Sequence, residues 1–182
     1  MSALQLENLA QDADGILIAN NTAFMCASAF RLWDDSVKGK NIQVCNNLIL
    51  GAASPDMIFL DSGGDPLKPR GPGDGRLLHQ AWKLSHNWRE VKTPKGKGLL
   101  EESWIPPGPD DVRQDAIEVL SRDPLHADFL RPASTSPLAR QGAGTKDPSL
   151  PAYVGALPPQ GAQPWDWDKT WKARGPVNAQ SQ

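Results

Sequence analysis

The feature that most constrains this chain is an internal repeat marked by two asparagine pairs. GILIANNTAF, residues 15–24, aligns with NIQVCNNLIL, residues 41–50, at an offset of 26 residues. The alignment places the first asparagine pair on the second, Asn20 and Asn21 on Asn46 and Asn47. Apolar residues alternate before each pair, as in a strand with one buried face. Repetition at this period without an amphipathic helix in the unit predicts a β solenoid.

A second pair of segments extends the repeat. AFRLWDD, residues 29–35, aligns with MIFLDS, residues 57–62, at an offset of 28 residues. This alignment places Phe30 over Ile58 and Leu32 over Leu60. Upstream, LQLENLA resembles a worn copy of the asparagine unit, with matching positions at Leu4, Leu6 and Asn8. The sequence therefore predicts two clear coils and a third that is less regular.

Stacking explains why a strand would carry an asparagine pair. In a parallel β solenoid, equivalent residues of successive coils lie about 4.8 Å apart. Asparagine tolerates the left-handed backbone of a tight corner, and its amide can hydrogen-bond to the asparagine in the next coil. We expect Asn20 to stack on Asn46, or Asn21 on Asn47. The alternative is a β-sandwich in which the two asparagine turns coincide by chance.

Proline divides the chain. None of its 17 prolines precedes position 55, which leaves the first part free to pair in sheets. We expect parallel β-helix coils over 1–62, and over 63–160 a continuation and closing segment of the β-helix with Pro/Gly-rich loops. The remainder, 161–182, is a Trp-rich tail that we expect to be partly disordered. Its tryptophans suit either packing onto the solenoid or a sugar-stacking platform.

Three local predictions concern the middle and end of the chain. Alternation over WKLSHNWRE, 82–90, predicts a strand with His86 packed between tryptophans, although 77–82 also suits a short helix. A helix is predicted near 110–121, with an Asp110 or Asp111 N-cap and a proline beyond its end. Its apolar stripe would be Val112, Ala116, Ile117 and Leu120. A short strand is predicted around Tyr153–Ala156.

Composition narrows the function classes. A formal net charge of −2 gives no electrostatic argument for nucleic acid or an anionic membrane, and no apolar run is long enough to span a bilayer. The N-terminal residues lack the basic and apolar regions of a signal peptide, and an extracellular or cell-surface location follows only if the full-length protein is exported. Cys26 and Cys45 suit two buried thiols better than a disulfide. The three histidines have no ligand spacing, so we expect no metal or other cofactor.

The order of these motifs resembles a known family. The asparagine coils resemble right-handed parallel β-helix repeats of the pectin-lyase-like class. DFLRPASTSPLARQGAG, with PAYVGALPP after it, resembles the ending of bacterial multidomain β-helix proteins, and SHNWRE is similar to a strand that often precedes that ending. The resemblance implies a mainly β fold: a right-handed parallel β-helix of two to three coils with one short amphipathic helix and a loop-rich C-terminal part. Because solenoids need about three units, we expect the C-terminal end of a longer protein, or a chain that needs a partner at its N-terminal face.

The resemblance also implies two functions. One is a carbohydrate-active enzyme, a polysaccharide lyase or hydrolase, with calcium possible only for a lyase. Its weak catalytic candidates are Asp34, Asp35 and Asp61, with Asp65, Lys38, Arg70 and Arg89 nearby in the sequence. A strand-ending aspartate is also a plain turn former. We therefore favour a non-catalytic β-helix module for carbohydrate or protein interaction, with a polysaccharide or the missing N-terminal coils as partner.

Overall fold

The fold was analysed in a computed structural model of the chain. The structure describes residues 2–6, 13–33, 40–52, 54–60, 82–90, 108 and 110–162. The expected Trp-rich tail over 163–182 lies outside these residues, as does the possible short helix over 77–82 apart from its last residue. Within the described part, no helix is long and apolar enough to cross a membrane.

The described strands form three parallel sheets. The strands are β1 (Ser2–Leu6), β2 (Leu17–Ala19), β3 (Thr22–Phe24), β4 (Ser28–Trp33), β5 (Ile42–Cys45), β6 (Leu48–Leu50), β7 (Ser54–Leu60), β8 (Trp82–Ser85), β9 (Trp88–Glu90) and β10 (Val112–Gln114). The sheet orders are β1-β4-β7, β2-β5-β8 and β10-β9-β6-β3, and every pairing is parallel. The predicted mainly β fold with parallel strands is confirmed.

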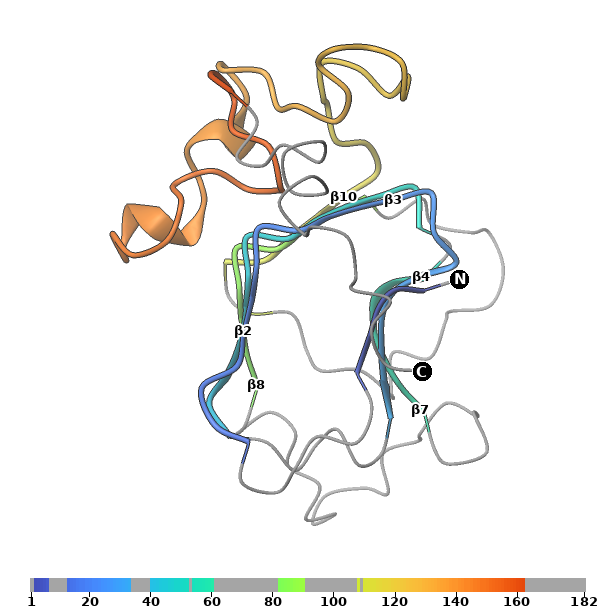
Figure 1. Ribbon diagram of the computed structural model, residues 1–182, viewed down its shortest axis with the longest axis vertical. Coiled ribbons are helices and arrows are strands. Elements are labelled where there is room, and N and C mark those ends of the chain that lie inside the picture. The colour runs from blue at the N-terminus through green and yellow to red at the C-terminus, as the bar shows by residue number, and fades with distance from the viewer. Residues whose placement is uncertain are drawn as a thin grey trace, which may run out of the picture.

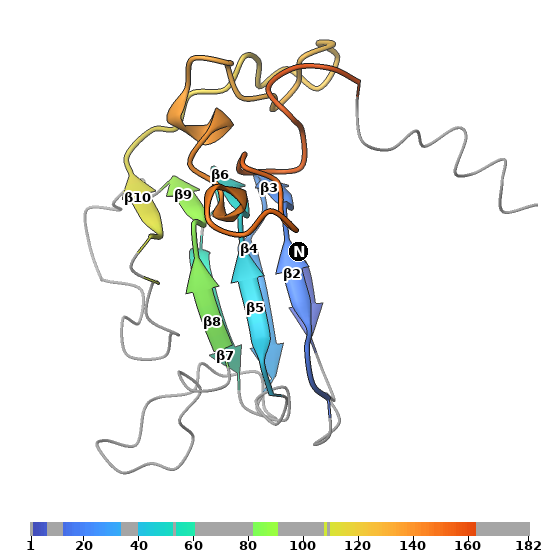
Figure 2. The same cartoon turned by 90° about the vertical axis from the view of Figure 1, so that its left-hand side faces the viewer.

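The chain visits the three sheets in a fixed order. It runs through β2, β3 and β4, which we call the first pass, and then through β5, β6 and β7, the second pass. The third pass contains β8 and β9, and β10 adds one more strand beside β9. Figure 1 shows strands of successive passes lying over one another, and Figure 2 shows β2, β5 and β8 side by side. Each strand therefore pairs with its equivalent in a neighbouring pass.

The register agrees with the first repeat and corrects the second. Ile18 pairs with Val44 and Thr22 with Leu48, which is the predicted offset of 26 residues. Phe30, however, pairs with Met57 rather than Ile58, because the register shifts between Ser28 and Phe30. Such an irregularity adds a residue to one strand and has no sequence signature of its own.

Two related corrections follow from the same sheet. Leu32 pairs with Phe59 rather than Leu60. Leu4 and Leu6 pair with Phe30 and Leu32, so the first strand is a copy of β4 and not of the asparagine unit. Asn8 lies outside the described residues.

Two apolar clusters occupy the two sides of the β3-β6-β9 sheet. Ile49 belongs to a cluster between the sheets with Ile18, Val44 and Phe30, among others. Leu48 and Leu50 belong to a second cluster, in which β6 meets Leu138 and Val154 of the C-terminal part. All three residues of β6 are therefore buried, as in a strand covered on both faces.

The predicted helix near 110–121 is wrong. Residues 112–114 form β10, and the only helices among the described residues are two short 3₁₀ turns, Pro137–Ala139 and Ala143–Thr145. The apolar stripe does not exist, because Ala116 and Leu120 are exposed while Ile117 is buried. The Asp111 carboxylate accepts hydrogen bonds from Asn87 instead of capping a helix. A tertiary contact has overridden the local helix signal.

Two other local predictions are corrected. The segment 82–90 is not one strand but two, β8 and β9, separated by a corner at His86 and Asn87. Residues 153–156 form no strand. They are held by single backbone hydrogen bonds, from Val154 N–H to the Leu138 carbonyl and from Gly155 N–H to the Asn46 carbonyl.

Candidate functional site

Three equivalent corners connect the strands on one side of the molecule. Asn20, Asn46 and His86 each have left-handed backbone conformations, with φ of 54°, 56° and 57°. Asparagine and histidine are among the residues that tolerate this region. The left-handed residue turns the chain sharply, so that β2 leads to β3, β5 to β6 and β8 to β9. His86 is therefore a corner residue, 3.8 Å from Asp110, rather than a side chain packed between tryptophans.

The second residue of each corner joins a continuous hydrogen-bonded chain. Asn21 Nδ2 donates to Asn47 Oδ1 at 2.9 Å, Asn47 Nδ2 to Asn87 Oδ1 at 2.8 Å, and Asn87 Nδ2 to Asp111 Oδ1 at 3.0 Å. We call these four residues the inner ladder. The backbone N–H of each asparagine donates to the same oxygen as its side chain does. Each rung from Asn47 onward thus accepts two hydrogen bonds from the rung before it.

The inner ladder is closed at the Asp111 end. Asp111 Oδ2 accepts from Arg89 Nη2 and from Gly108 N–H, both at 3.1 Å. The side chains of Arg89 and Asp111 are 2% and 0% exposed. An ionised carboxylate has no proton to donate, so it ends a chain of donors. The guanidinium of Arg89 offsets the burial of its charge.

The inner ladder is open at the other end. Asn21 is exposed, and its two amide protons go to Ala19 O and Asn47 Oδ1. Among the described residues, none donates to Asn21 Oδ1. Asn21 also lies between β2 and β3, which are both edge strands of their sheets. The backbone edge and the ladder therefore end at the same place.

The first residue of each asparagine corner points outward and holds the C-terminal part. Asn20 Nδ2 donates to the carbonyls of Tyr153 and Gly155, both at 3.0 Å. Asn46 Nδ2 donates to the Pro151 carbonyl at 2.9 Å and to Asn20 Oδ1 at 3.2 Å. These bonds fasten a segment far along the chain to the corners.

Two further contacts fix the same segment. Asn46 Oδ1 accepts from Ala143 N–H at 2.6 Å. Gly155 has φ of 92°, and a Cβ there would lie 3.0 Å from Thr22 Oγ1. Glycine is thus required where the segment crosses β3. The Asn46 side chain uses both its oxygen and its amide to anchor this segment.

A buried ion pair fixes the loop between β10 and that segment. Arg122 donates to both oxygens of Glu90, at 2.9 and 3.1 Å, and to the Ile117 carbonyl at 2.8 Å. Glu90 is 2% exposed and also accepts from Gly51 N–H. A bidentate pair of this kind holds both partners in one geometry.

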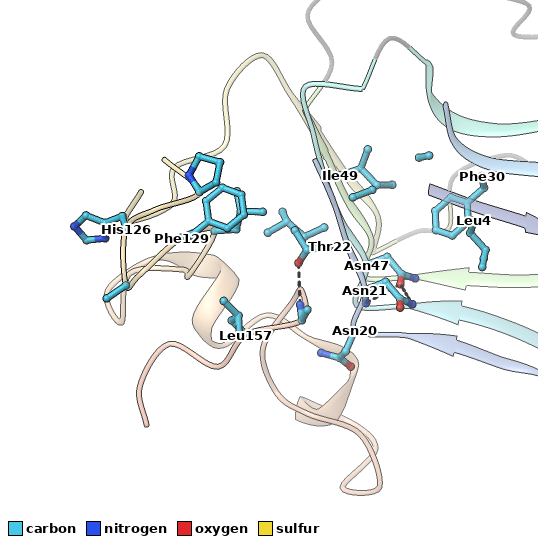
Figure 3. Close-up of a pocket in the computed structure, with 17 residues that line it drawn as sticks. Leu4, Asn20, Asn21, Thr22, Phe30, Asn47, Ile49, His126, Phe129 and Leu157 are labelled. Carbon is cyan, nitrogen blue, oxygen red and sulfur yellow. Dashed lines mark hydrogen bonds between the residues drawn. The ribbon is translucent and has the colours of Figure 1, made fainter. Parts of the chain in front are cut away.

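A cavity of about 660 Å³ runs along the open edge of β3. We call it the edge groove. Figure 3 shows Phe129, His126 and Leu157 on one side of β3, and Ile49, Phe30 and Leu4 on the other. A cavity that touches both faces of a strand lies along its edge. The lining is mostly apolar, and its polar side chains are Asn20, Asn21, Thr22, Asn47 and His126.

The outer wall of the edge groove is held by aromatic contact. Phe129 meets Phe24 of β3 edge-on, with ring centroids 5.5 Å apart and an interplanar angle of 83°. Ala156 N–H donates to Thr22 Oγ1 at 2.9 Å. The groove therefore has a preformed wall on its outer side.

The residues predicted from sequence fall into two groups. Both expected asparagine pairs form hydrogen bonds, Asn21 with Asn47 and Asn20 with Asn46. The weak catalytic candidates Asp34, Asp35 and Asp61 lie outside the described residues, as do Asp65, Lys38 and Arg70. Arg89 is buried beside Asp111. Cys26 and Cys45 do not form a disulfide, and Cys45 is buried.

Sequence reasoning missed two rungs of the inner ladder. Asn87 and Asp111 follow the earlier rungs at separations of 40 and 24 residues instead of 26. The signal was present in SHN and PDD, which repeat a polar corner pair before a short strand. In the described part of the chain, no group of three or more His, Cys, Asp or Glu is placed to hold a metal ion.

The chain matches no protein-family model, no curated protein sequence and no solved structure.

Proposed function

We propose that this chain is a non-catalytic, right-handed parallel β-helix module that binds a polypeptide segment along the edge groove. The order of the strands supports the β-helix, because each pass adds one strand to each of three parallel sheets. The inner ladder supports it as well, since stacked amides are typical of parallel strands in register.

The observation that carries the binding proposal is the position of the groove beside an unpaired strand. Leu48 N–H donates to the Asn21 carbonyl and Met25 N–H to the Leu50 carbonyl, so alternate residues of β3 face β6. The backbone N–H and C=O of Thr22 and Phe24 therefore face the groove. An extended peptide can add to such an edge through main-chain hydrogen bonds and gain specificity from side-chain pockets.

The chemistry of the lining favours a polypeptide over a sugar. The walls are built mainly of Leu, Ile, Phe, Ala and Pro side chains, and none of the lining residues is an acid, a lysine or an arginine. Sugar hydroxyls placed against such walls would lose hydrogen bonds to water without replacement. Apolar side chains of a peptide would instead be stabilised by leaving water.

The test is hydrogen exchange of the full chain with β-strand peptides and, in parallel, with acidic and neutral polysaccharides. We expect a bound peptide to slow exchange at Thr22 and Phe24, whose amides face the groove. Phe129→Ala should weaken binding at least tenfold, because it removes the outer wall. Leu125→Ala is the matched control, since Leu125 is 94% exposed and does not line the groove.

Two results would contradict the proposal. One is a polysaccharide that binds the wild-type chain and loses affinity in Phe129→Ala. The other is release of reducing or unsaturated sugar by the purified chain.

A further inference from the structure

We infer that the edge groove takes one kind of segment: two short strands joined by an asparagine corner, whose amide donates to Asn21 Oδ1. This inference rests on the proposed polypeptide binding and names the partner's chemistry. It follows from three features: the pass that β1 begins, the direction of the inner ladder, and the apolar ends of the sheets.

The first feature is an incomplete pass. In the β1-β4-β7 sheet, β1 covers β4, whereas β2 and β3 have no neighbour on the same side. A pass visits the three sheets in the order of β2, β3 and β4, so β1 is the last strand of a pass whose first two are empty. The empty positions lie beside β2 and β3. They fit a segment as long as residues 16–24, with its corner over Asn20 and Asn21.

The second feature is the direction of the inner ladder. The side-chain oxygens of Asn47, Asn87 and Asp111 each accept one side-chain and one backbone N–H from the preceding rung. Asn21 has spent both amide protons, and only its side-chain oxygen remains for a partner. The partner must therefore bring donors. Asparagine brings both, whereas aspartate would set a carboxylate against an oxygen.

The third feature is the pattern of inward side chains. Ile18 pairs with Val44, which pairs with Leu84, and Ala23 pairs with Ile49. Apolar residues thus stand over one another at each inward position. The open end presents the half-buried Leu4 and Ile16 beside this cluster. A partner with apolar residues at the same positions would cover them.

The closed end of the ladder argues against a second copy stacking head to tail. Its last rung is Asp111, whose oxygens already accept from Asn87, Arg89 and Gly108. That end has no side-chain amide to offer to Asn21 of another molecule. The partner is therefore a separate strand–corner–strand segment with an asparagine donor.

The chain itself contains a segment of this chemistry, which serves as the probe. Residues 41–51 carry apolar residues at the inward positions and an asparagine at the second corner position. A fluorescein-labelled peptide of this sequence, with Cys45→Ser to prevent oxidation, is titrated with the full chain by anisotropy. The matched control is the same peptide with Asn47→Asp. We expect the control to bind at least tenfold more weakly, because it loses a donor and gains a repulsive charge.

Two further arms locate the contact. In the register of β2 on β5, the peptide N–H at position 44 faces the chain and that at position 43 faces away. N-methylation at position 44 should abolish binding, and N-methylation at position 43 should not. Asn21→Ala in the full chain should bind the parent peptide and its Asn47→Asp control within about threefold of each other, because the shared acceptor is gone.

The outcomes separate the two proposals. Equal binding of the two peptides to the wild-type chain, with N-methylation at position 44 still blocking, overturns the asparagine inference and leaves strand addition intact. The same holds if straight-strand peptides bind while the corner peptide does not. Binding that ignores N-methylation overturns both proposals. A chain dimer in sedimentation equilibrium that the peptide dissociates would place a second copy on this edge and overturn the inferred partner.

Discussion

The sharpest test of the inner ladder is one substitution made at two of its rungs, Asn47→Leu and Asn21→Leu. The Asn47 side chain makes four hydrogen bonds: it accepts two from Asn21 and donates to Asn87 Oδ1 and to the Ile18 carbonyl at 3.0 Å. Asn47 is 1% exposed, so water cannot replace these partners. Leucine has a similar volume and no polar atom, which limits the effect to lost hydrogen bonds.

The magnitude follows from the contacts. A net contribution of about 1 kcal/mol per hydrogen bond gives about 4 kcal/mol for Asn47, reduced to about 3 kcal/mol because Asn21 lies at an exposed end. The Asn21 side chain makes only two hydrogen bonds and is exposed, so its loss costs about 1 kcal/mol or less. With a slope of about 2 kcal/mol/M in urea, the midpoints should fall by about 1.5 M and less than about 0.5 M.

The assay is urea unfolding followed by tryptophan fluorescence and circular dichroism, since the chain has seven tryptophans as probes. Coincident transitions by the two probes are required before the midpoints are compared. Equal losses at the two positions would refute the reasoning, because they would mean that the exposed and buried rungs are equivalent. A loss below about 1 kcal/mol for Asn47→Leu would mean that the ladder contributes little stability.

Three further predictions concern the rest of the site. Asp111→Asn puts an amide where Arg89 needs a carboxylate, and we expect a loss of about 2–4 kcal/mol in urea unfolding. Asn46→Gly keeps the left-handed corner but removes the anchors of the C-terminal part, so amide exchange over 143–155 should rise at least tenfold while β5 stays protected. Burial, and then the charges of Asp147 and Asp111, raise the pKa of the Cys45 thiol, so at pH 8 a thiol reagent should modify Cys26 first and Cys45 only on unfolding. Because the folded pKa of Cys45 is the higher one, the folded state disfavours the thiolate, and stability present below about pH 8.5 should decline as the pH rises further, an effect absent from Cys45→Ala.

The first asparagine pairs could be predicted because two passes of equal length separate them. The third and fourth rungs could not be found by period, since Asn87 lies 40 residues after Asn47 and Asp111 only 24 residues after Asn87. What stays constant is the chemistry of the corner: a residue that accepts a left-handed backbone, then a ladder residue, then a short strand. A search for that unit at variable spacing would have found SHNWRE.

The helix predicted near 110–121 failed for a different reason. Acidic residues followed by a long amphipathic pattern are a real helix signal, and nothing local contradicts it. The deciding interaction lies 24 residues away, where Asn87 donates to Asp111. A hydrogen bond within a continuous buried chain outweighs a propensity difference of a few tenths of a kcal/mol per residue. Local patterns were thus reliable within one pass and unreliable wherever the ladder set the conformation.

The asymmetry of the inner ladder connects its stability to its proposed function. A stack of identical asparagines would leave a donor at one end and an acceptor at the other, and both ends could take another rung. Replacing the last rung with Asp111 and pairing it with Arg89 removes the donor end, because every oxygen there is already occupied. The acceptor end keeps its exposed Asn21 beside the two unpaired strands. The same residues that hold the passes together therefore allow the stack to be extended in only one direction, at the edge groove.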